Sequence, residues 1–143
     1  MAGEAAGKVK AEAELDAELK KFAKEFVPDL QQAIDKYGEQ VDLFTDQRAA
    51  FARDMARLGV DPDKRPAYKT KGEIIEKMKA DARKLAEDRR ETYIRWKELS
   101  LLRDSADTKA QRDKLLQNAH KAAKSADETF EKYMQQSAEP DPK

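Results

Sequence analysis

Hydrophobic positions recur every three or four residues through the first part of the chain. From Leu15 onward the average step is about 3.6 residues, which is the period of one face of a straight α-helix. The positions are Leu15, Leu19, Phe22, Phe26, Leu30, Ala33, Tyr37, Val41, Phe44, Phe51, Met55 and Leu58, with Arg48 as the one interruption. The pattern predicts a helix over residues 10–58, and this helix requires a second surface on which its apolar face is buried.

Pro28 lies inside this predicted helix. Proline removes a backbone donor and clashes with the preceding helical turn. The hydrophobic period nevertheless continues from Phe26 to Leu30, so we expect a kink near residue 28 within one helix, or a very tight break. The apolar face is widest over residues 22–34, which favours contact with two neighbouring helices over a two-stranded coiled coil.

The end of the first helix is marked by Gly59, followed by Val60 and Pro62. A glycine just past the helix, an apolar residue after it and a nearby proline are typical of a Schellman motif. In such a motif Val60 contacts Met55. We therefore expect the first helix to end near residue 58.

A proline-containing loop follows, and Tyr68 in it either covers the end of the bundle or protrudes as a contact. Thr70 and Glu73 have the spacing of a capping box just ahead of an apolar pair of isoleucines. This spacing predicts a second helix over residues 70–103. Its apolar line includes Trp96, which is either a core residue between helices or a partner-binding residue.

The pattern fades to polar residues between residues 103 and 112. Thr108 and Gln111 can open a third helix over residues 108–136, whose heptads are regular. Because no Gly or Pro interrupts this stretch, a turn and a continuous helix over 70–136 are both open. Residues 137–143 contain two prolines and are expected to form a disordered tail.

Composition supports an all-α fold. Ala, Glu, Lys, Leu and Arg make up 77 of the 143 residues, a bias typical of long helices and coiled coils. Three segments of similar length favour an elongated antiparallel three-helix bundle, with a long helical hairpin as the alternative. We expect a single helical domain over residues 1–143, in which residues 10–27 form a protruding or back-folded arm.

Several classes of protein are disfavoured by what the sequence lacks. Cysteine is absent, which excludes disulfides and thiol chemistry and is compatible with a reducing compartment. No apolar run is long enough to span a membrane, and the N-terminus resembles neither a secretory signal nor a transit peptide. The expected location is cytoplasmic.

Charge is distributed unevenly although the net charge is zero. Residues 1–63 carry a balance of −5, residues 64–103 of +6 and residues 104–143 of −1. One interpretation places an acidic first helix beside a basic second helix, so that complementarity selects the pairing. The other is that the basic helix binds an anionic membrane surface or an acidic protein. Nucleic acid is disfavoured by the interleaved acidic residues and the zero net charge.

No sequence motif for catalysis is present. A glycine-rich phosphate loop, a nucleophile elbow and metal-spaced His or Cys residues are all missing. His120 is the single histidine and is expected to be a partly packed or surface residue. We therefore expect no catalytic residues, no metal, no cofactor, no small-molecule substrate and no enzymatic activity.

The hypothesis that remains is a structural or adaptor subunit that acts through helix–helix contact with another protein or with its own copy. The alternative is a helical bundle that binds anionic lipid or nucleic acid through residues 70–103. The candidate partner-binding residues are Leu15, Leu19, Phe22, Phe26, Arg89, Arg90, Tyr93, Arg95 and Trp96.

Overall fold

The computed structural model describes the backbone of residues 2–138 and the side chains of residues 11–137. Its α-helices are α1 (Ala2–Phe26), α2 (Pro28–Arg57), α3 (Pro66–Leu101) and α4 (Ala106–Ala138), and a short 3-10 helix, η1 (Pro62–Lys64), follows α2. Over residues 2–138 the structure contains no strand, so the predicted all-α class is confirmed.

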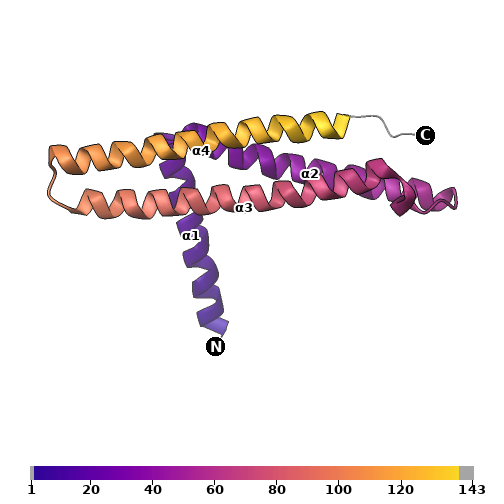
Figure 1. Ribbon diagram of the computed structural model, residues 1–143. Helices are drawn as coiled ribbons and strands as arrows, with labels where there is room; N and C mark the ends of the chain where they lie inside the picture. Colours follow the sequence, from indigo (N-terminus) through magenta and orange to yellow (C-terminus); the bar gives the residue numbers. More distant parts are fainter. Residues whose placement is uncertain (1, 139–143) are drawn as a thin grey trace.

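Helices α2, α3 and α4 lie side by side, and α3 runs antiparallel to the other two (Figure 1). At one end, α2 and α3 extend past the end of α4. At the other end, α3 and α4 extend past the start of α2. Helix α1 crosses α3 at a steep angle, and its N-terminal part projects away from the other helices (Figure 1).

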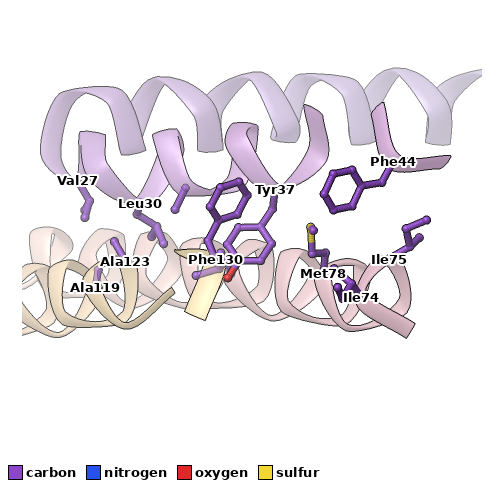
Figure 2. Close-up of a cluster of buried hydrophobic side chains, with 12 residues drawn as sticks. Val27, Leu30, Tyr37, Phe44, Ile74, Ile75, Met78, Ala119, Ala123 and Phe130 are labelled. Atoms are coloured by element: carbon purple, nitrogen blue, oxygen red, sulfur yellow. The ribbon is translucent and has the colours of Figure 1, made fainter. Parts of the chain in front are cut away.

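The core runs along the centre of the bundle, where α2 faces both α3 and α4 (Figure 2). Tyr37 is fully buried and its hydroxyl donates to the carbonyl oxygen of Ala126 at 2.7 Å. Its ring meets that of Phe130 edge to face, with centroids 5.3 Å apart. The largest fully buried side chains are Tyr37, Leu30, Ile74, Met78, Leu99 and Val27.

A single residue separates α1 from α2, so the expected kink within one helix is wrong and the tight break is what forms. Val27 has φ −141° and ψ 63°, outside the helical region, and Pro28 is the first residue of α2. Proline disfavours a helical residue before it and is well suited to the first position of a helix. The side chain of Val27 is itself fully buried.

The end of α2 confirms the predicted Schellman motif. Gly59 has φ +71°. Its amide donates to the carbonyl of Ala56 at 3.1 Å, and the amide of Val60 donates to the carbonyl of Met55 at 2.9 Å. These two bonds satisfy carbonyl groups at the helix end.

The predicted start of the second helix at Thr70 is wrong, because α3 begins at Pro66. Thr70 therefore lies inside the helix and does not cap it. Pro66 occupies the first helical turn, where the missing proline donor is not needed. Tyr68 also lies in α3, and its ring stacks on Phe51 of α2 with centroids 5.9 Å apart.

The turn between α3 and α4 excludes a continuous helix over residues 70–136, since helix is interrupted between Leu101 and Ala106. The capping box is present but starts three residues earlier than predicted. The Ser105 amide donates to the Thr108 hydroxyl at 3.0 Å, and the Thr108 amide donates to the Ser105 hydroxyl at 3.2 Å. Thr108 is thus the third residue of the helix and not its cap.

The outer boundaries also differ from the prediction. Helix α1 begins at Ala2 and not near residue 10. Helix α4 runs to Ala138, so the first two residues of the predicted tail are helical, and residues 139–143 lie outside the described residues. Over residues 2–138, no helix combines the length and the apolar character needed to cross a bilayer.

Candidate functional site

Four of the predicted partner-binding residues come together where α1 crosses α3. Phe22 and Phe26 of α1 contact Trp96 of α3, with ring centroids 5.4 and 4.7 Å away. Tyr93 meets Phe22 edge to face at 5.2 Å. We call these four residues, Phe22, Phe26, Tyr93 and Trp96, the aromatic junction. Such pairs contribute about 0.5–1.5 kcal/mol each beyond the burial of their area.

The α1 side of this junction is more deeply buried than the α3 side. Leu19 and Phe22 are 6% and 5% exposed. Phe26, Tyr93 and Trp96 are half-buried. The junction is therefore an intramolecular contact that still presents aromatic edges to the solvent.

A partly buried polar cluster lies beside the aromatic junction. Arg89 of α3 is 6% exposed, and its Nη1 donates to Oε1 of Gln31 at 2.8 Å. Its Nη2 pairs with Asp16 of α1 at 3.4 Å. The Nε of Arg89 is buried and has no hydrogen-bond partner. One turn further along α3, the Tyr93 hydroxyl donates to Glu18 at 3.1 Å.

The remaining candidates lie elsewhere on the surface. Leu15 is half-buried and Arg90 is exposed. Arg95 is exposed and pairs with Glu98 of its own helix at 3.2 Å. Of the three arginines expected to face an anionic partner, Arg89 is thus turned inward and Arg95 already has an acidic neighbour.

Sequence reasoning missed the polar residues that tie α1 to the bundle. Asp16, Glu18 and Gln31 gave no signal, because each is an ordinary polar residue and its partner lies 58 to 75 positions away along the chain. Gln31 is 2% exposed although it follows Leu30 on the buried side of α2. The sequence alone gives no sign that Gln31 is buried.

Charge pairing between the first and second predicted helices is sparse. Among residues 11–137, the ion pair that joins the acidic segment 1–63 to the basic segment 64–103 is that of Asp16 with Arg89. Between α2 and α4 there is an ion pair of Lys36 with Asp127 and a side-chain contact of His120 with Asp29. Complementary ion pairs are therefore not what holds α2 against α3.

A second apolar feature lies at the end of α3. Leu101 and Leu102 are 81% and 57% exposed, and Ile94 is 43% exposed. Their hydrophobicity alone does not distinguish these residues from core residues. Leu99, only two positions before Leu101, is 2% exposed.

His120 is exposed, and its Nδ1 lies 2.7 Å from Oδ1 of Asp29. This pair joins α4 to the first turn of α2. Within the described part of the chain, no group of three or more His, Cys, Asp or Glu side chains could hold a metal ion.

Comparison of the chain with protein-family models, with curated proteins and with solved structures gave no match.

Proposed function

We propose that this chain is a non-enzymatic adaptor or structural subunit, an elongated three-helix bundle that binds another protein through the N-terminal part of α1. The observation that carries the proposal is the path of α1. Its C-terminal half crosses α3 at the aromatic junction, and its N-terminal part projects from the bundle (Figure 1). The predicted arm over residues 10–27 does not project as a whole, because Asp16, Phe22 and Phe26 contact α3. From here on, the arm means residues 2–14.

The arm has the properties of a helix that packs on a partner. Ala11, Glu12, Ala13 and Glu14 are all exposed, so these described arm side chains contribute little to the bundle. A short helix without tertiary contacts is only marginally stable in water, and packing supplies most helical stability in proteins. Small alanine side chains allow a second helix to approach closely. A helix of the partner is therefore the contact that we propose for the arm.

The apolar end of α3 supports the same proposal. Leu101 and Leu102 lie in and beside the α3–α4 turn and are largely exposed. Neighbouring exposed leucines are unfavourable in water and are common at protein contact sites. A partner that spans the arm and this turn would bury both.

The alternative, binding of anionic lipid or nucleic acid through α3, has less support. It relies on the arginines at positions 89, 90 and 95, of which Arg89 is buried in the cluster with Asp16 and Gln31. We retain a cytoplasmic location as part of the proposal, on the strength of the absence of cysteine.

Site-specific photo-cross-linking tests the proposal. A photoreactive amino acid replaces Glu14 in the arm, and the matched control carries it at Glu128, an exposed position of α4. The proposal predicts that position 14 gives a discrete cross-linked species in the native extract and that position 128 does not. Mass spectrometry of the product distinguishes a second copy of the chain from a different protein.

Two outcomes would contradict the proposal. One is a cross-linking pattern that is the same at both positions. The other is that neither position 14 nor a photoreactive residue placed at Leu101 gives any cross-linked product. A product from Leu101 alone would move the partner to the α3–α4 turn and would reject the arm.

A further inference from the structure

A small pocket lies between α2 and α3, far along the chain from the aromatic junction. Its volume is about 250 Å³. It is lined by Gln47, Arg48, Phe51, Ala67, Tyr68 and Lys71. This part of the bundle lies toward the end where α2 and α3 extend past α4 (Figure 1). Pockets for drug-sized ligands are usually about 300–1,000 Å³, so this one suits a smaller molecule.

Two cations line the pocket without any carboxylate. Arg48 and Lys71 are both half-buried. Among residues 11–137, neither forms an ion pair: Arg48 donates from Nε to the carbonyl of Tyr68 at 2.9 Å, and Lys71 donates to the side-chain oxygen of Gln47 at 3.0 Å. A partly desolvated cation with no counter-charge is unfavourable. An anion in the pocket would supply that counter-charge.

Aromatic rings hold both cations in place and form the apolar wall. The Arg48 guanidinium lies over the Tyr68 ring, with Cζ 3.7 Å from the ring centroid. Tyr68 in turn stacks on Phe51. Lys71 lies over the ring of Phe44, with Nζ 4.6 Å from the centroid. A guanidinium fixed by stacking presents its planar edge in one orientation, which suits a carboxylate.

Gly72 provides the space that this arginine occupies. A Cβ atom at position 72 would lie 2.7 Å from Nη2 and 2.8 Å from Cζ of Arg48. Any side chain there would displace the guanidinium from its place over Tyr68. Arg48 is also the residue that interrupts the hydrophobic series of the first 58 residues, and a polar residue at that position is explained by this arrangement.

Burial lowers the pKa of the Lys71 ammonium. The direction of this shift is that of a cation without a nearby negative charge. It agrees with the geometry of the pocket.

We propose that the pocket between Arg48 and Lys71 binds a small carboxylate that carries a planar apolar body. The carboxylate pairs with the two cations, and the apolar body lies against the Phe51 and Tyr68 rings. This binding site is independent of the arm and of the proposed protein partner.

Titration of the full chain with three probes tests the proposal, with binding followed by nuclear magnetic resonance and calorimetry. The probes are 2-naphthoate, the uncharged 2-naphthalenemethanol and inorganic sulfate. We expect 2-naphthoate to shift the amide signals of residues 47–51 and 67–71, and to bind at least about tenfold more tightly than either other probe. Equal affinity of the alcohol, or shifts confined to another region, would overturn the proposal.

Variants test whether Arg48 and Lys71 bind the carboxylate of the probe. Lys71→Gln should weaken 2-naphthoate binding at least about tenfold, whereas Lys77→Gln, the same change at an exposed position of α3, should leave it unchanged. Gly72→Ala keeps every charge and should also weaken binding, because it displaces Arg48. Its control is Gly38→Ala, where the new Cβ meets no atom within 4 Å.

Circular dichroism melting curves show whether each variant is folded. A folded Lys71→Gln variant that binds 2-naphthoate as tightly as the wild type would overturn the proposal, and so would a wild-type chain that binds none of the probes.

Discussion

Among the side chains of residues 11–137, Arg89 is the buried one with a hydrogen-bonding group that has no partner. Two of its nitrogens reach Gln31 and Asp16, but Nε is buried without a partner. A buried unpaired donor costs about 1–3 kcal/mol. Because Asp16 belongs to α1, this cluster lies where α1 docks on the bundle.

Glycines at positions 38 and 59 should respond in opposite directions to alanine. Gly38 is exposed in the interior of α2 with open space around it, so Gly38→Ala should stabilise the fold by about 1 kcal/mol through helix propensity. Gly59 has φ +71°, which costs an alanine about 1 kcal/mol. Urea unfolding measures both. Stabilisation by Gly59→Ala would contradict the Schellman geometry.

Stability should decline at alkaline pH because two tyrosines resist ionisation in the folded state. Burial, together with Asp81, raises the pKa of Tyr37, and burial with the hydrogen bond to Asp81 raises the pKa of Tyr133 to about 12. An unfolded tyrosine has a pKa of about 10. The stabilisation is therefore complete below pH 10 and is lost as the pH rises toward 12.

The variant Tyr133→Phe isolates this effect. It loses the 2.8 Å hydrogen bond to Asp81 and should be about 1 kcal/mol less stable at neutral pH. Its melting temperature should then fall less steeply between pH 10 and 12 than that of the wild type. A parallel decline of the two proteins would show that Tyr133 does not contribute to the alkaline transition.

At the scale of the helices, the sequence was most informative where one local signal acts alone. The Gly59 stop was predicted because a left-handed residue strongly favours glycine. The predicted helix start at Thr70 is wrong because Pro66, four residues earlier, is an equally good first residue of a helix. Thr108 was recognised as part of a capping box, but Ser105 and not Gln111 is its partner.

The Ser105–Thr108 capping box should contribute measurably to stability. Ser105→Ala removes the acceptor for the Thr108 amide at the start of α4, and the expected loss is about 1 kcal/mol. Thermal unfolding followed by circular dichroism measures it. The change Ser125→Ala, at an exposed position within α4, serves as the control and should have little effect. Equal losses in the two variants would argue against the cap.

The docking of α1 on α3 can be followed through Trp96, the single tryptophan. Phe22→Ala removes a ring that contacts Trp96, and a large-to-small change at such a buried position costs about 3 kcal/mol. We expect the emission of Trp96 to shift to longer wavelength as its exposure rises. The control Phe51→Ala, near the C-terminal end of α2, should leave the emission of Trp96 unchanged. A blue-shifted or unchanged spectrum for Phe22→Ala would contradict the junction.

The aromatic residues of this junction could be chosen from the sequence, but their contacts could not. Their size and spacing marked them as core or interface residues. Which helix they meet depends on the direction of α1, which is set by the backbone of the single residue Val27. The hydrophobic period gives no sign of that change in direction, since it continues from Phe26 to Leu30 across the break.

At the scale of the whole molecule, the two halves of α1 have different surroundings. The C-terminal half is tied to α3 by the aromatic junction, by Arg89 with Asp16 and by Tyr93 with Glu18. The arm projects from the bundle (Figure 1). One helix is thus divided into a docked half and a projecting half.

Hydrogen exchange of the full chain, measured by mass spectrometry, tests this division of α1 into a docked half and a projecting half. Amides in packed helices exchange slowly and amides in helices without tertiary support exchange rapidly. We predict slow exchange over residues 17–26 and rapid exchange over residues 2–14, with the arm becoming protected in a partner-bound fraction isolated by cross-linking at position 14. Uniform protection along the whole of α1 in the isolated chain would contradict the division of this helix. An arm that stays unprotected in the partner-bound fraction would contradict its role as the binding segment.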